Sequence, residues 1–211
     1  GREALDWLTT LDHAIDDGET HALILQDELL AFGVRLGNAV HAMDFGLFYS
    51  EDSKLLHIGY DVSNARLDAN HYDLLASEAR IASFIAIAKG DVPLEHWFAL
   101  GRPVTTHRGE VALVSWGGTM FEYLMPALFM KSTRRTLLSQ SCRVAVAAQI
   151  SYGARNEVPW GISESGFYEF DGEQNYQYRT FGVPGLGIRR GLGDDLVIAP
   201  YASAMALNMR P

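Results

Sequence analysis

Apolar residues recur at helical spacing along the first 43 positions of the chain. In "REALDWLTTLDHAIDD" they occupy positions 4, 5, 7, 8, 11 and 15, after which Gly18 interrupts the pattern. The same period resumes in "HALILQDELLAFGVRLGNAVHAM", from about 21 to 43. Because residues three and four apart share one face of a helix, the pattern predicts two amphipathic helical segments separated near Gly18.

Short extended segments replace the helical period after this point. Aromatic and alternating residues in "MDFGLFYSEDSKLLHIGYD" predict two strands, 44–49 and 54–60. The polar residues "SEDS" between them are typical of a four-residue turn. The pattern therefore predicts one small β-hairpin.

A second helix is predicted over "LDANHYDLLASEARIASFIAIAKGD". Asp68 is the expected N-cap, Gly90 the C-terminal stop, and Lys89 stabilises the C-terminal end of the helix dipole. A shorter helix is expected at roughly 93–100. Residues 101–110 are predicted to form a loop, and the last two-thirds of 111–130 a helix in which Pro126 is a kink or an early-turn residue.

The rest of the chain divides into a helix, a long irregular segment and a final helix. "RRTLLSQSCRVAVAAQISYG" predicts a helix closed by Gly153, and helical spacing restarts near 200. Between 154 and 200, glycine, proline and aromatic residues are frequent and no regular period is visible. A long irregular segment in a compact domain is usually functional or disordered, and the aromatic content argues against disorder. We therefore expect one mainly α-helical domain with a small β-hairpin.

Composition excludes several classes of function. The net charge is −9, whereas binding to nucleic acid phosphates requires an excess of lysine and arginine. The longest apolar run, 81–88, is far shorter than a membrane span. The one cysteine, Cys142, cannot form a disulfide within the chain, and we expect it to be a small buried apolar residue. This pattern fits a reducing compartment.

Three glutamates stand out by their apolar or aromatic neighbours. Glu78 lies in the middle of an apolar helix, where a carboxylate must be paired, with Arg80 or another arginine, or have a function. Glu122 has apolar neighbours and no lysine or arginine before Lys131. Glu164 lies in the irregular stretch "NEVPWGISESGFYEF", close in sequence to Trp160 and several other aromatic residues. Carboxylates beside aromatic rings are typical of carbohydrate sites, although each aromatic taken singly also fits a core position.

Other motifs carry little signal. The glycines of "GVPGLGIRRGLG" lack the strand and helix that a dinucleotide site requires, and they match no phosphate-binding loop. The seven histidines show no metal-binding spacing, so we expect neither a metal nor a cofactor. Ser77 and Ser163 lack the GxSxG context of a serine nucleophile.

Several long blocks of the sequence resemble the central domain of bacterial cyclic β-1,2-glucan synthases. The similar blocks run in the family's order and include "LDANHYDLLASEARIASFIAIAKGDVPLEHWFALGR", "SWGGTMFEYLMPALFM", "QISYGARNEVPWGISESGFYEFD", "NYQYRTFGVPGLGIRRGL" and "DLVIAPYASAMAL". This domain belongs to a glucoamylase-like group that also includes β-1,2-glucanases. The resemblance implies an (α/α)6 toroid in which inner helices surround a cavity. Because a full ring needs twelve helices and we count roughly seven to nine, we expect residues 1–211 to be a single but incomplete toroid within a longer synthase.

The resemblance also implies an activity and its residues. Such a domain closes linear β-1,2-glucan into a ring by transglycosylation, between a linked glycosyltransferase domain and a phosphorylase-like domain. It would lie in the cytoplasm as part of an inner-membrane-associated protein. By motif, Glu164 is the expected acid/base and Glu78 the expected nucleophile, with the order of these two roles open. The residues expected near the glucan are Tyr72, Asp73, Trp116, Glu122, Trp160, Tyr176 and Gln177.

Two other functions remain compatible with the sequence. An inverting β-1,2-glucan hydrolase would hold its two carboxyl groups farther apart, with a water molecule between them. A non-catalytic glucan-binding module of a larger synthase would bind glucan without either glutamate.

Overall fold

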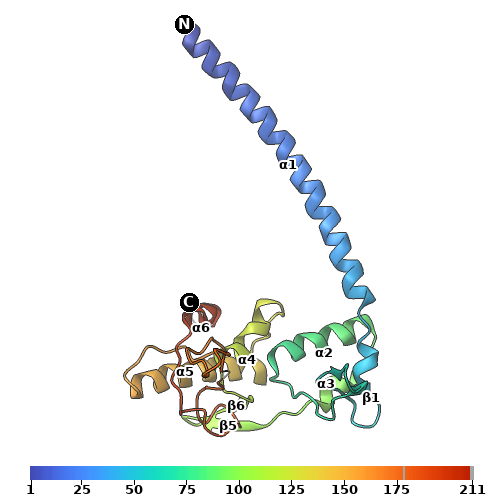
Figure 1. Cartoon of the computed structure of the whole chain (residues 1–211), viewed down its shortest axis with the longest axis vertical. Helices are drawn as coiled ribbons and strands as arrows, with labels where there is room; N and C mark the ends of the chain where they lie inside the picture. The colour runs from blue at the N-terminus through green and yellow to red at the C-terminus, as the bar shows by residue number, and fades with distance from the viewer. Residues whose placement is uncertain (178, 210–211) are drawn as a thin grey trace. The chain divides into compact units, whose positions relative to one another are not determined.

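The computed structural model of the chain describes residues 1–177 and 179–209, with the backbone alone at Ser77, Glu78 and Asn208. The chain divides into two units, residues 1–44 and 45–211. Figure 1 shows the long helix of the first unit and the smaller elements of the second. Among the described residues, no helix combines the length and the apolar content that crossing a bilayer requires.

The first unit is one continuous helix, α1 (Arg2–Ala42), of 41 residues. The predicted interruption at Gly18 is wrong. A single glycine inside a helix costs only about 1 kcal/mol relative to alanine, and the long helical segments on both sides offset that cost. No residue of α1 is buried, so its apolar side chains, Leu8 and Leu29 among them, are exposed.

The second unit begins with a short 3-10 helix, η1 (Phe45–Phe48), and two hairpins. Strands β1 (Tyr49–Ser50) and β2 (Leu55–Leu56) pair antiparallel, which confirms the predicted hairpin in shorter form. Strands β3 (Tyr60–Asp61) and β4 (Arg66–Leu67) form another pair.

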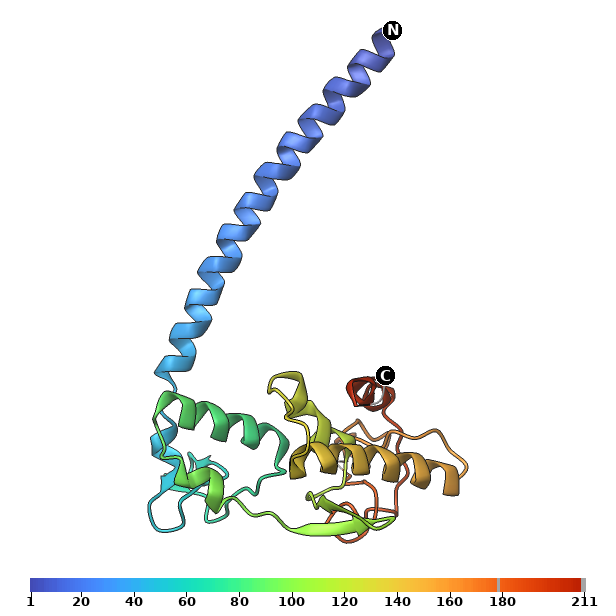
Figure 2. The ribbon, with the colours of Figure 1, turned by 180° about the vertical axis from the view of Figure 1, so that it is seen from behind.

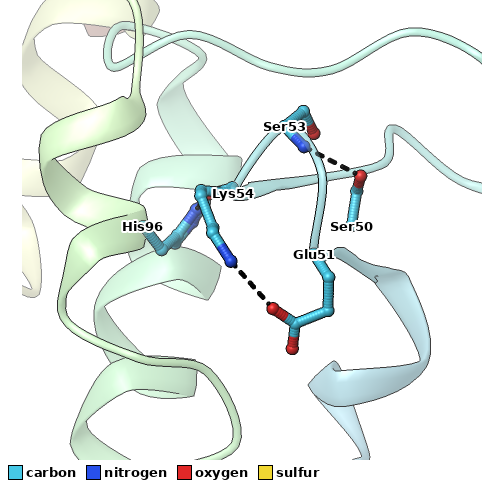
Figure 3. Close-up of polar contacts among 5 residues, drawn as sticks. All are labelled: Ser50, Glu51, Ser53, Lys54 and His96. Carbon is cyan, nitrogen blue, oxygen red and sulfur yellow. Dashed lines mark hydrogen bonds and ion pairs between the residues drawn. The ribbon is translucent and has the colours of Figure 1, made fainter.

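The turn of the first hairpin is held by its own polar residues. The Ser53 amide donates to Ser50 Oγ at 3.2 Å, and Lys54 forms a 2.9 Å ion pair with Glu51 (Figure 3). His96, which lies beside Lys54 in the same view, contacts the Lys54 carbonyl through Nδ1 at 2.9 Å. The hairpin is thereby attached to the helix that carries His96.

The next helix is shorter than predicted. Helix α2 (Ser77–Lys89) starts after Ala76, so the prediction of Asp68 as its N-cap is wrong. Asp68 instead accepts the backbone amide of Asn70 at 2.7 Å, in a local turn. Gly90 ends α2 with a left-handed φ of 81°, and Lys89 lies in the last turn, as predicted.

Helix α3 (Glu95–Ala99) confirms the short helix, but the predicted loop after it contains a hairpin. Strands β5 (Val104–His107) and β6 (Glu110–Leu113) pair antiparallel around Arg108 and Gly109, both with positive φ. Positive φ at both central residues is the geometry of a tight hairpin turn.

Helix α4 (Met120–Leu124) and the 3-10 helix η2 (Met125–Leu128) follow, with Pro126 in the first turn of η2. Helix α5 (Leu137–Arg155) continues past Gly153, so the prediction of Gly153 as its end is wrong. Asn156 is the C-cap instead, and it donates both its backbone amide and its Nδ2 to the Tyr152 carbonyl.

The main core lies between α4, α5, β6 and the irregular segment that follows α5. It includes Leu113, Tyr123, Val146 and Leu186, all at most 2% exposed. Cys142 is also buried here, as predicted. Figures 1 and 2 both show α5 beside the β5–β6 hairpin, with α2 and α3 at the other end of this unit.

Residues 156–199 form no helix or strand in their described part, apart from isolated bridges. Glycines in this segment and in the turn before α4 allow close backbone contacts. A Cβ on Gly182 would lie 1.6 Å from the Gly117 carbonyl oxygen, and one on Gly118 would lie 2.7 Å from that of Val183. The chain then forms α6 (Pro200–Met205), the predicted final helix, and the 3-10 helix η3 (Ala206–Asn208).

Candidate functional site

A cavity of about 780 Å³ opens in the second unit. Its wall combines carboxylates, aromatic rings and a histidine from four separate segments of the chain. The lining residues are Ile58, Asn70, His71, Tyr72, Asp73, Ala76, Trp116, Phe121, Glu122 and Glu164. A volume of this size accommodates a small ligand or a few sugar units.

The segment before α2 supplies Tyr72 and Asp73. Asp73 is half-buried, and one carboxylate oxygen accepts the Leu75 amide at 2.9 Å. Burial raises the pKa of Asp73 above its ordinary value, and the neighbouring charge of Glu122 adds to this increase. Asp73 therefore holds a proton more readily than an exposed aspartate, which suits hydrogen bonding to sugar hydroxyl groups.

The carboxylate of Glu122 organises the turn that precedes α4. Its Oε2 accepts Ser115 Oγ at 3.0 Å and both the amide and the hydroxyl of Thr119 at 2.9 Å. The amide of Gly117 donates to Oε1 at 3.0 Å. Glu122 and Thr119 also form a capping box at the N-terminus of α4. These donors satisfy a buried carboxylate without a cation.

The same turn presents Trp116 to the cavity. Its side chain is 59% exposed, whereas its backbone carbonyl accepts the Arg189 amide at 3.2 Å. The Ser115 amide donates to the Leu186 carbonyl, and the Ser115 carbonyl accepts the Ile188 amide. The indole is thus an exposed aromatic face on a firmly held backbone, the arrangement that stacks on a sugar ring.

The loop that carries Glu164 is attached to the core just before the glutamate. Gln149 on α5 donates to the Ile162 carbonyl at 2.9 Å and accepts the Ile162 amide at 2.8 Å. The amide of Met120, at the start of α4, also donates to the Ile162 carbonyl. Glu164 therefore extends into the cavity from a fixed point.

Two hydroxyl groups hold the backbone at Glu164 itself. Ser163 Oγ accepts the amide of Phe121 at 2.9 Å. The Tyr201 hydroxyl lies 2.9 Å from Ser163 Oγ and 2.7 Å from the Glu164 carbonyl oxygen. The side chain of Glu164 lines the cavity while its main chain is held from α4 and α6.

Three other predicted residues lie outside the cavity wall. Trp160 packs partly buried against the main core. The Tyr176 hydroxyl accepts the amide of Phe167 at 2.8 Å, and Gln177 Nε2 donates to Asp171 at 3.1 Å. Their contact with a glucan stays a prediction.

Glu78 is the second residue of α2, and its side chain lies outside the described part of the structure. Ala76, two positions earlier, lines the cavity. Arg80, its expected alternative partner, is buried and donates to the Tyr123 carbonyl at 3.4 Å. Burial lowers the pKa of the Arg80 guanidinium. The geometry between Glu78 and Glu164 therefore stays a prediction.

The sequence did not predict five residues of the cavity wall, which are Ile58, Asn70, His71, Ala76 and Phe121. His71 is held by Ser53 Oγ at 3.3 Å, and its ring centroid lies 4.5 Å from that of His57. Its position beside Tyr72 and Asp73 in "NHYD" was the available signal. Within the described residues, no group of three or more His, Cys, Asp or Glu could hold a metal ion.

Comparison with known proteins assigns the chain to a family. A family model described as "Putative glucoamylase" matches residues 70–211. The chain belongs to this glucoamylase-like family. It is also 48% identical over 200 residues to a protein of Rhizobium meliloti (strain 1021), "Cyclic beta-(1,2)-glucan synthase NdvB". That alignment covers 95% of this chain and 7% of the relative, so the chain spans a small part of the relative's length.

Family membership fits a helical domain that carries small antiparallel strand pairs. In this glucoamylase-like chain the cavity brings Glu164, Asp73 and Glu122 together with Trp116. Glu122 Oε2 accepts several donors from the protein, whereas its Oε1 accepts the Gly117 amide. Asp73 accepts the Leu75 amide, and Glu164 comes from an anchored loop. The wall can therefore stack on a sugar ring, bind hydroxyl groups and transfer protons.

Proposed function

We propose that this domain cyclises linear β-1,2-glucan by retaining transglycosylation within a larger cyclic glucan synthase. The observation that carries the proposal is the cavity that Glu164 shares with Trp116 and Asp73. It is supported by the 48% identity to a relative named as a cyclic β-(1,2)-glucan synthase. The notable feature of ring closure is that a sugar hydroxyl, rather than water, must attack the activated sugar.

The reaction proceeds in two displacements. Glu164 donates a proton to the glycosidic oxygen as Glu78 attacks the anomeric carbon, and the leaving segment of glucan departs with that proton. The 2-hydroxyl at the non-reducing end of the same chain then attacks the glycosyl ester. Glu164 accepts the hydroxyl proton, Glu78 is released and the new β-1,2 bond closes the ring. We expect the two carboxyl groups to lie about 5–5.5 Å apart.

The backbone position of each glutamate is compatible with its proposed role. Glu78 lies on a helix, which favours a nucleophile held in line with the anomeric carbon. Glu164 extends from a loop fixed at Ile162 and Ser163, so its carboxyl can reach a leaving oxygen from a defined direction. The remaining proposed contacts to the glucan come from Tyr72, Asp73, Trp116, Glu122, Trp160, Tyr176 and Gln177.

The surrounding architecture is part of the same proposal. Residues 1–211 would form a single, incomplete section of an (α/α)6 toroid. The intact protein would carry linked glycosyltransferase and phosphorylase-like domains and associate with the inner membrane, with this domain on the cytoplasmic side. The small covered fraction of the relative, 7%, supports a longer parent protein.

The test replaces each glutamate by glycine in the full-length protein and assays linear β-1,2-glucan with and without azide. Glu78→Gly and Glu164→Gly should each lose cyclisation by at least about 100-fold. In a retaining enzyme, azide replaces the missing nucleophile to give an α-glycosyl azide, and it intercepts the glycosyl-enzyme of the acid/base variant to give the β-anomer. The anomer formed by each variant therefore assigns the two roles.

The control is Glu157→Gly, because Glu157 has a positive φ of 56° that glycine adopts without strain. It should cyclise like the unmodified protein. Near-normal cyclisation by both active-site variants would contradict the proposal. An inverted first product by NMR would favour the hydrolase, and glucan binding without turnover in the intact parent would favour a binding module.

A further inference from the structure

Tyr201 connects α6 to the backbone of Glu164 across 37 residues of sequence. Its hydroxyl lies 2.7 Å from the Glu164 carbonyl oxygen and 2.9 Å from Ser163 Oγ. Ser163 is fully buried, and its hydroxyl also accepts the Phe121 amide at 2.9 Å. The three groups form a continuous chain of hydrogen bonds from α4 to the glutamate.

The direction of each bond follows from the number of protons available. A carbonyl oxygen only accepts, so Tyr201 must donate its single hydroxyl proton to Glu164. Tyr201 therefore accepts from the hydroxyl of Ser163, and Ser163 in turn accepts from the amide of Phe121. With these directions, each donor of the hydrogen-bond network is used once.

Further bonds attach α6 to the same loop. The Ala199 amide donates to the Gly161 carbonyl at 2.9 Å, and Ser203 Oγ donates to the Trp160 carbonyl at 2.9 Å. Ala202 is fully buried between these contacts. The start of α6 and the loop up to Glu164 are therefore held together at several consecutive positions.

We infer that Tyr201 is a positioning residue, which orients the acid/base carboxyl of Glu164 through its main chain. This inference rests on the proposed function of Glu164. Proton transfer to a leaving group depends on placing the carboxyl within a fraction of an ångström of its target. Burial raises the pKa of Tyr201, the hydrogen bond from Ser163 lowers it and the charge of Glu164 raises it. The phenol consequently stays protonated, and a donor, at neutral pH.

The test compares two glycosyl donor substrates of the full-length protein that carries Tyr201→Phe. One donor is linear β-1,2-glucan, whose leaving alcohol needs a proton. The other is a β-1,2-glucan oligosaccharide with a 4-nitrophenyl aglycone, whose phenolate leaves without one. We expect kcat/KM to fall about 10- to 100-fold on the glucan and less than about 3-fold on the nitrophenyl donor. Ser163→Ala should show the same selective loss on glucan, because it removes the hydroxyl that links Phe121 to Tyr201 in the hydrogen-bond network.

Tyr60→Phe is the matched control, because Tyr60 is 44% exposed and Tyr201 is 42% exposed. This variant removes a hydroxyl group from β3, and its kcat/KM should be unchanged on both substrates. An equal loss on both donors, or no loss on glucan, would overturn the inference. Thermal unfolding of each variant corrects the rates for the folded fraction.

Glu164→Gln separates this inference from the proposed function. It should show the same dependence on the leaving group, with a larger loss on glucan. Full activity of Glu164→Gln would contradict the proposed function. If Glu164→Gln loses kcat/KM on glucan selectively and Tyr201→Phe does not, only the role inferred for Tyr201 is contradicted.

Discussion

The side-chain amide of Gln149 pairs with both backbone groups of Ile162. Its Oε1 accepts the Ile162 amide at 2.8 Å and its Nε2 donates to the Ile162 carbonyl at 2.9 Å. Each residue is only 1% exposed, so no water replaces these bonds. A glutamine on α5 thereby fixes the loop two residues before Glu164.

Gln149→Leu should destabilise the domain by about 1–3 kcal/mol, because it leaves the buried Ile162 amide without an acceptor. Urea denaturation followed by tryptophan fluorescence measures the change. Gln140→Leu is the control, since its bond to the Val111 carbonyl is exposed to water, and we expect a loss below about 1 kcal/mol. Equal losses in the two variants would contradict the assigned role of Gln149.

Glu122→Gln should lower the free energy of unfolding by about 1.5–3 kcal/mol, because charge-assisted bonds from Ser115, Gly117 and Thr119 are weakened or lost. Glu110→Gln is the matched control, since its side chain is 56% exposed and lies 3.9 Å from Arg143. The control should change stability by less than about 0.5 kcal/mol. If Glu122→Gln is as stable as the control, the carboxylate does not hold the turn.

Asp73→Asn should stabilise the fold at neutral pH while lowering activity. The folded-state pKa of Asp73 is raised by burial, so its ionised form destabilises the native state at pH values above that pKa. Asparagine retains the oxygen that accepts the Leu75 amide but carries no charge. The gain in melting temperature should therefore be largest near pH 7 and disappear at pH 3, below the ordinary pKa of 3.8.

Asp61→Asn gives the comparison of opposite sign. Hydrogen bonds from Asn64 lower the pKa of Asp61, so its ionised form favours the native state above the ordinary pKa. Its substitution should lower the melting temperature slightly at pH 7 and have no effect at low pH. Identical pH profiles for the two variants would refute the assignment for Asp73.

His96 should make the second unit sensitive to mild acid. Burial lowers its folded-state pKa below 6.5, although the bond to the Lys54 carbonyl partly opposes this. The Nδ1 proton is donated to that carbonyl, so Nε2 accepts from Ser83 Oγ at 2.8 Å in the neutral ring. Below pH 6.5 the unfolded state takes up a proton that the folded state resists, and stability falls.

His96→Gln should remove this part of the pH dependence between pH 7 and pH 5, as measured by melting temperature. His13→Gln, in exposed α1, is the control and should leave the profile of the unmodified protein unchanged. An unaltered acid profile in His96→Gln would show that another group is responsible.

The sequence predicted the ends of an element correctly where those ends depend on residues close by in the chain. Gly90 ends α2 because glycine adopts the left-handed conformation without steric cost. Pro126 lies in the first turn of η2, where its missing amide is not needed. Asp68 was misleading because its side chain prefers a two-residue turn with Asn70. The Arg108–Gly109 turn was missed because a positive φ at arginine leaves little trace in sequence.

The candidate site was predictable only in part. The apolar and aromatic neighbours, together with the family resemblance, pointed to Asp73, Trp116, Glu122 and Glu164, which share one cavity. The residues that hold them, Gln149, Ser163 and Tyr201, looked like ordinary helix or loop positions. Their bonds reach partners 13, 42 and 37 residues away.

The sequence by itself determined the helical character of the chain, its first hairpin, its family and the identity of the acidic and aromatic candidates. Helical period, turn residues and motifs are local properties, so they can be read without a structure. Only the tertiary structure decided how the Glu122 carboxylate is satisfied and which side chains hold the loop of Glu164. Those arrangements depend on buried polar groups finding partners across the fold, because an unpaired group in the interior costs more than any local preference provides.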